Sequence, residues 1–188
     1  CFARALDFFE HSGQVFGQVL CLSNIGQYHL HKEQTESAFT VLEKAVQLVP
    51  EVNESSLHIN VLQLWSRCLS VRKAFAEAAE ALEAAVLLDQ PLANHQSRTS
   101  LYLAQAFYFQ NLGDDQSAQE YYLSSILHAF QSPIVNNRIN ALLEFGRYLA
   151  GRRGPHESLF THPQYPELCR LIDHDATSGH PLVVRIFR

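Results

Sequence analysis

Apolar and small residues recur along this chain with a constant step of 40 positions. Bulky apolar residues form two columns in that register, which run Phe2, Leu42, Leu82, Tyr122 and Leu6, Val46, Val86, Ile126. Small residues form two more, which run Ala38, Ala78, Ala118, Ser158 and Ala5, Ala45, Ala85, Ser125. A fixed step is typical of repeat proteins, in which each repeat is one small structural unit.

Within each repeat, the spacing of these residues is helical. The second half carries small, large and small residues at i, i+4 and i+7, starting at Ala38, Ala78 and Ala118, which places each trio on one helix face. The first half carries a stripe at i, i+3 and i+6, starting at Leu22 and Leu62, which also suits a helix. Since little chain separates the two halves, each repeat is predicted to be an antiparallel helix pair.

Prolines end the helix pairs where this interpretation requires an end. Pro50, Pro91 and Pro133 follow the second helix of successive repeats, and proline is disfavoured inside a helix. The pattern predicts helices over residues 1–11, 14–31, 35–49, 55–72, 75–89, 95–112, 115–131 and 135–150.

The predicted organisation has two parts. Residues 1–150 hold the repeats, and 1–11 are the second helix of a partial repeat. In residues 151–188 glycines and prolines interrupt the pattern. There we expect an irregular segment, a short capping helix over Pro166–Asp173, and an apolar tail over Leu182–Phe187. A chain that begins at Cys1 and contains no methionine is expected to be a piece of a longer protein.

The repeats resemble the tetratricopeptide repeat (TPR) family. The best match is the first repeat, with the residues Leu22, Ile25, Gly26, Ala38, Leu42, Ala45 and Pro50. The second repeat departs from the family pattern at Ser66, where glycine is usual, and the third has Gln105 and Ala106 where Leu-Gly is usual. The step also exceeds the usual ~34 residues, as in the long-helix TPR subclass. The resemblance implies an all-α fold, a right-handed alpha-alpha superhelix. A generic helical bundle or a HEAT-type solenoid is the alternative.

Composition limits the classes of partner. The net charge is -5 and only three lysines occur, so there is no positive excess with which to bind nucleic acid. No apolar run has the ~18 residues of a membrane span. The four cysteines are too few and scattered for a disulfide framework, and we expect reduced thiols in a cytoplasmic protein, with the nucleus as the alternative.

The sequence contains little that indicates a catalytic or metal-binding site. The densest cluster of metal-ligand types lies between His162 and His180, without a recurrent zinc spacing. No nucleophile signature or glycine-rich phosphate loop occurs, so we expect neither an enzyme nor a cofactor. Trp65 falls in the packing stripe, where a core role is expected.

The TPR resemblance implies a binding groove lined by the first helix of each repeat. The outward positions of those helices are Ser23, Asn24, Gln27, Gln63, Arg67, Leu103, Phe107, Leu143, Glu144 and Arg147. Arg67 and Arg147 occupy one column two repeats apart, and their guanidinium groups suit carboxylates or carbonyls of an extended peptide.

The predicted function is a non-catalytic adaptor or scaffold that holds a partner peptide or helix in the groove, with an acidic ligand among the candidates. Capture of a chaperone's carboxyl terminus is disfavoured, because the lysines used for it in the family are missing. A structural arm in a larger complex and a regulatory sensor domain are the alternatives, and self-association stays open.

Overall fold

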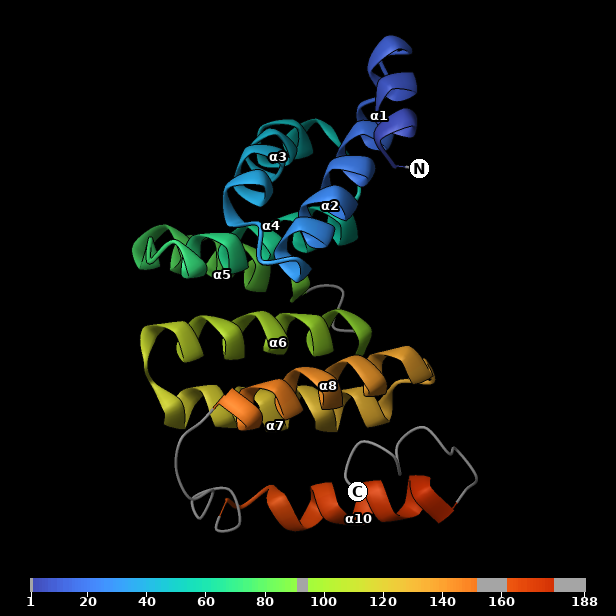
Figure 1. Cartoon of the computed structure of the whole chain (residues 1–188). Helices are drawn as coiled ribbons and strands as arrows, with labels where there is room; N and C mark the ends of the chain where they lie inside the picture. The colour runs from blue at the N-terminus through green and yellow to red at the C-terminus, as the bar shows by residue number, and fades with distance from the viewer. Residues whose placement is uncertain (1, 91–94, 152–161, 178–188) are drawn as a thin grey trace. The chain divides into compact units, whose positions relative to one another are not determined.

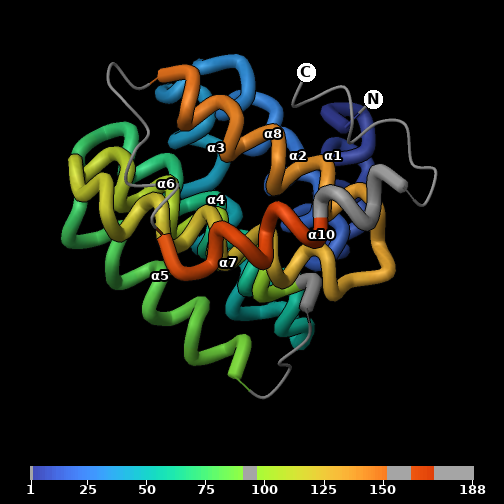
Figure 2. Tube along the Cα trace, turned by 90° about the horizontal axis from the view of Figure 1, so that it is seen from below, coloured from blue at the N-terminus to red at the C-terminus, as the bar shows by residue number. Residues whose placement is uncertain are grey.

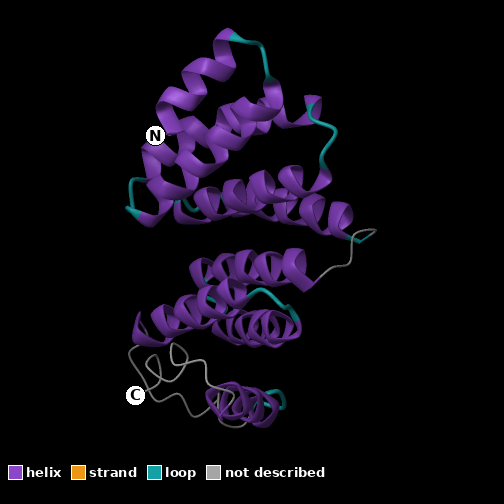
Figure 3. Cartoon of the chain, turned by 90° about the vertical axis from the view of Figure 1, so that its right-hand side faces the viewer, coloured by secondary structure: helices purple, strands orange, loops and turns teal. Residues whose placement is uncertain are grey.

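The computed structural model describes residues 2–90, 95–151 and 162–177, and these residues form helices joined by short loops (Figures 1 and 3). Cys1, Pro91, Ser158 and the predicted tail Leu182–Phe187 lie outside the described residues. The chain divides into two compact units, Cys1–Ala93 and Asn94–Arg188, and the division falls inside the stretch predicted to be one run of repeats.

The described part of unit 1, residues 2–90, contains five α-helices and one short 3-10 turn. They are α1 (Phe2–His11), α2 (Val15–His31), α3 (Thr35–Leu48), η1 (Val49–Glu51), α4 (Ser55–Val71) and α5 (Phe75–Asp89). The described part of unit 2 contains α6 (His95–Leu112), α7 (Asp115–Gln131), α8 (Val135–Gly151) and α10 (Tyr165–Thr177). The all-α prediction is confirmed for these residues, and the predicted helix ends within the repeats agree with the observed ends to one residue.

The turn inside each helix pair has the same geometry in three repeats. The loop contains one residue with a positive φ, which is Glu33 (58°), Lys73 (65°) or Gly113 (88°), and these residues are 40 positions apart. A left-handed residue after a helix lets the next N–H bond back to the last turn. The three resulting bonds are Gln34 N–H to His29 O (2.9 Å), Ala74 N–H to Leu69 O (3.0 Å) and Asp114 N–H to Phe109 O (3.0 Å).

Small residues on the first helix allow the second helix to pack closely. A Cβ at Gly26 would collide with the side chain of Leu42, so only glycine fits the observed approach there. Ser66 stands at the equivalent place, and its hydroxyl donates to the carbonyl of Ala78 at 2.9 Å, which satisfies a buried polar group. Ala106, the third member, is completely buried.

The small-residue columns of the second helices are buried as the sequence predicts. Every member on α3, α5 and α7 is 0% exposed, namely Ala38, Ala45, Ala78, Ala85, Ala118 and Ser125. Ala5 on α1 is half-buried. Because close-packed interiors leave few voids, such positions leave little room for a larger side chain.

Successive helix pairs also pack in the same way inside each unit. In unit 1, α4 contacts both α2 and α3, and in unit 2, α8 contacts both α6 and α7. Cys68 on α4 points its thiol at the carbonyl of Thr35 (3.8 Å). Two repeats later, the hydroxyl of Tyr148 on α8 donates to the carbonyl of Asp115 (3.2 Å). The same contact between neighbouring pairs therefore occurs in both units.

The core of unit 2 is aromatic. Tyr122 on α7 stacks on Tyr148 at 4.9 Å between ring centroids and meets Phe145 at 5.8 Å. α10 packs against α7, as Figure 2 shows, and contributes the buried side chain of Leu168 to this core. The helix predicted over Pro166–Asp173 is therefore present, and it extends beyond both predicted ends.

Candidate functional site

The predicted groove residues fall on two pairs of adjacent helices. In unit 1 they lie on α2 and α4, which contact each other, and in unit 2 on α6 and α8, which also contact each other. The column that joins Arg67 to Arg147 therefore spans both units, and its continuity stays a prediction.

Two of the predicted groove residues are buried, which corrects their assignment as outward positions. Ser23 is 2% exposed, and its hydroxyl donates to the carbonyl of Leu20 in its own helix (3.0 Å). Gln63 is 5% exposed. Both residues lie on first helices that contact each other, α2 and α4. Neither side chain is available to a partner in this arrangement.

The other groove positions of unit 1 reach solvent. Gln27 is exposed, while Asn24 and Arg67 are half-buried. The amide of Asn24 donates to the carbonyl of Leu20 (2.7 Å). This side of unit 1 therefore presents polar and cationic groups.

The groove positions of unit 2 are more apolar. Leu103 and Phe107 are half-buried, and Leu143 is 40% exposed. Arg147 donates to the carboxylate of Glu144 at 2.9 Å. The Arg147 side chain is 64% exposed and that of Glu144 20%, so the guanidinium group also faces solvent, where a partner carboxylate can reach it.

Unit 1 also contains a pocket of about 720 Å³ that the sequence did not predict. α3 and α5 form its walls, and α4 forms its floor. The lining residues are Phe39, Val46, Leu62, Trp65, Leu69, Arg72, Ala74, Glu77, Glu80, Ala81 and Ala84. We call this the α3–α4–α5 pocket, and it shares no residue with the predicted groove.

An aromatic pair stands on one side of the α3–α4–α5 pocket. The rings of Phe39 and Trp65 lie 4.9 Å apart at 37°. The guanidinium carbon of Arg72 lies 3.7 Å from the centre of the Phe39 ring, within the range of a cation–π contact. Trp65 thus packs against a neighbouring helix, as predicted, but it is only half-buried and also lines the pocket.

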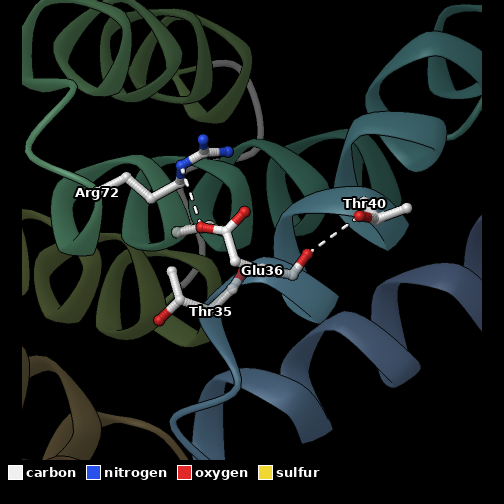
Figure 4. A network of polar contacts seen from close by, with 5 residues as sticks. Thr35, Glu36, Thr40 and Arg72 are labelled. Atoms are coloured by element: carbon white, nitrogen blue, oxygen red, sulfur yellow. Dashed lines mark hydrogen bonds and ion pairs between the residues drawn. The ribbon is translucent and has the colours of Figure 1, made fainter.

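Arg72 is held at the edge of the pocket by a small polar network (Figure 4). Its Nε lies 3.8 Å from a carboxylate oxygen of Glu36, which is in the first turn of α3. Thr40 donates to the backbone carbonyl of Glu36 at 3.1 Å. The carboxylate is 81% exposed, so this ion pair orients Arg72 more than it stabilises the fold.

The pocket was not predicted from the sequence, because it arises where one repeat differs from the next. Ala81 stands 40 residues before Tyr121, whose ring stacks on Phe109 at 5.2 Å and meets Tyr102 at 6.1 Å. The positions equivalent to Phe109 and Tyr102 are Leu69 and Leu62, which line the pocket. Alanine in place of the large tyrosine leaves space in front of the two leucines.

The described residues offer little reactive chemistry. They contain no group of three or more histidine, cysteine or carboxylate side chains that could hold a metal ion. The thiols of Cys21, Cys68 and Cys169 are free, and the first two are buried. None of the described helices has the length and apolar character needed to cross a membrane.

The thiol of Cys68 is expected to be unreactive near neutral pH. Burial raises its pKa from 9.0 to about 11, with the charge of Arg72 opposing and that of Glu36 adding to this rise. Because the thiolate is the nucleophile, alkylation of native Cys68 should remain slow at pH 8 and accelerate through pH 11. Stability should likewise fall as the pH rises from 9 through 11, since the thiol of the unfolded chain ionises first.

Mass spectrometry after iodoacetamide treatment, residue by residue, measures this reactivity. The half-buried Cys169 and urea-unfolded protein serve as controls, and both should react faster at pH 8. Equal rates for native Cys68 and Cys169 would contradict the buried position.

Comparisons with protein-family models and with curated protein sequences find no match to this chain.

Proposed function

We propose that this chain is a TPR-like solenoid of antiparallel helix pairs that works as a non-catalytic protein-binding module. The supporting observation is the repeated geometry of the helix pairs, in which the turns and the small-residue columns recur at 40-residue steps. A contact between neighbouring pairs also recurs two repeats later, from Cys68 and Thr35 to Tyr148 and Asp115. Stacked helix pairs of this kind present an extended surface rather than an enclosed reaction site.

The proposed binding surface is the exposed part of the predicted groove. In unit 1 it consists of Asn24, Gln27 and Arg67, and in unit 2 of the residues Leu103, Phe107, Leu143, Glu144 and Arg147. Arginine can bind a carboxylate through two parallel hydrogen bonds, and the apolar residues add contact area. We propose an extended peptide or helix as the ligand, with carboxylates opposite the two arginines.

Selection from a displayed library of random peptides tests this function. Binders should be enriched in Asp and Glu, and the double substitution Arg67→Glu and Arg147→Glu should weaken them at least about tenfold without changing the circular dichroism. Arg170→Glu is the matched control, because Arg170 is exposed on α10 outside the groove. Binders that tolerate the double substitution would contradict the groove.

A structural arm of a larger assembly is the second candidate. Large apolar side chains are exposed on α1 and α2, among them Phe2 (51%), Phe8 (62%), Phe16 (51%) and Leu20 (41%). Exposed apolar groups on neighbouring helices favour contact with another subunit. Under this function, Phe8→Asp and Phe16→Asp should prevent assembly, whereas the two arginine substitutions should change little.

A further inference from the structure

The α3–α4–α5 pocket carries an inference that is independent of the groove. We propose that it is a second docking site, which takes an arginine or lysine side chain of a partner peptide together with the apolar residues that flank it. The pocket belongs to unit 1 alone, and its volume falls within the usual range of ligand-binding pockets, roughly 300–1,000 Å³.

The apolar lining suits the flanking residues and the stem of a long cationic side chain. Val46, Leu62 and Leu69 supply aliphatic surface. On α5, the small side chains of Ala81 and Ala84 occupy little of the space. Lysine and arginine bury their methylene stems along apolar surfaces while the charged end stays near polar groups. The half-buried indole of Trp65 adds an aromatic face, the preferred partner of a cation.

The charges around the pocket select a cation over an anion. Glu77 and Glu80 line it from α5 and are exposed, and no other described residue forms an ion pair with either carboxylate. Arg72 is the one cationic residue in the lining, and Glu36 already neutralises it across 3.8 Å. A ligand cation therefore meets two available carboxylates, while a ligand carboxylate would meet repulsion.

α5 as a whole has the same bias. Its sequence contains Glu77, Glu80, Glu83 and Asp89 and no lysine or arginine. Such a field increases the rate at which a basic segment reaches the surface, and the effect weakens with salt. Glu77 and Glu80 are exposed, so a side chain presented by a longer peptide can reach their carboxylates.

Trp65 allows a direct measurement, because it is the only tryptophan in the chain and lines the pocket. The probes are two capped pentapeptides that have either arginine or glutamate at the centre between pairs of leucines, and agmatine as a small cation without flanking residues. Titration of the whole chain at low salt should give a saturable change in Trp65 emission with the arginine peptide. The glutamate peptide and agmatine should bind at least about tenfold more weakly.

Three variants separate this site from the groove. The double substitution Glu77→Gln and Glu80→Gln removes two exposed charges and should weaken the arginine peptide by about tenfold. Ala81→Tyr introduces the residue of the next repeat and should abolish binding by filling the space. Arg67→Glu, in the predicted groove, should leave binding of this peptide unchanged.

Each contrary result would overturn the proposal. Equal binding of the arginine and glutamate peptides would remove the charge argument, and equal binding of agmatine would make the pocket a small-cation site. If the Glu77→Gln and Glu80→Gln double variant bound the arginine peptide with unchanged affinity, the charge argument would also fail. This test stands even if Ala81→Tyr does not fold. A loss of binding in Arg67→Glu would move the site to the groove, whereas failure of the groove prediction leaves this titration unaffected.

Discussion

Replacement of Tyr122 by alanine is expected to cost about 3–5 kcal/mol of unfolding free energy, the range for truncating a large buried aromatic residue. Tyr122 is 2% exposed and packs against the rings of Phe145 and Tyr148. Truncation would leave a cavity between α7 and α8, and the remaining rings cannot close it without leaving their own contacts. Urea denaturation followed by circular dichroism measures the loss.

Two controls separate the ring from the hydroxyl and from surface effects. Tyr122→Phe keeps the ring and removes the hydroxyl, which donates to the side-chain oxygen of Gln110 (2.7 Å), and should cost about 1 kcal/mol. Tyr28→Ala truncates a tyrosine that is 55% exposed and should change stability by less than about 0.5 kcal/mol. Similar losses of unfolding free energy in Tyr28→Ala and Tyr122→Ala would contradict the buried position of Tyr122 in the aromatic core.

Replacement of Ala85 by tryptophan is expected to lower the free energy of unfolding by about 1–3 kcal/mol or more. Ala85 is 0% exposed in the small-residue column of α5, where α4 packs closely. The indole can be accommodated only if the two helices separate, and this separation breaks the apolar contacts of unit 1. Thermal melting followed by circular dichroism should show a lower midpoint or a less cooperative transition.

Ala76→Trp is the matched control, because Ala76 is exposed on the same helix. It should leave the melting curve nearly unchanged. An unaltered cooperative melt in Ala85→Trp would contradict the assigned register of the repeats.

Most of the helical structure could be predicted from the sequence, because the repeats supply the same information several times. Small and large residues at i, i+4 and i+7 fix the buried face of a helix, and a shift of the register would bury polar groups in every repeat at once. The left-handed residues at Glu33 and Lys73 were not predicted, since only Gly113 has the residue type that this conformation favours.

The candidate sites could be predicted less well. A rule that alternates core and outward positions takes each first helix alone and ignores its contact with the neighbouring first helix, and it assigned the buried Ser23 and Gln63 to the outward side. The α3–α4–α5 pocket depends on the difference in volume between Ala81 and Tyr121, a departure from the repeat rather than a part of it. The excess of acidic residues in α5 is visible in the sequence, but the sequence does not show which of their carboxylates line the pocket.

We infer that the helix pairs of all three complete repeats share one packing geometry at a 40-residue step. Proton NMR on isotopically labelled protein tests it through nuclear Overhauser contacts across each pair. Contacts are expected between Gly26 and the methyl groups of Leu42, and between the equivalent pairs Ser66 with Leu82 and Ala106 with Tyr122. Their absence from any one of the three helix pairs would contradict the claim.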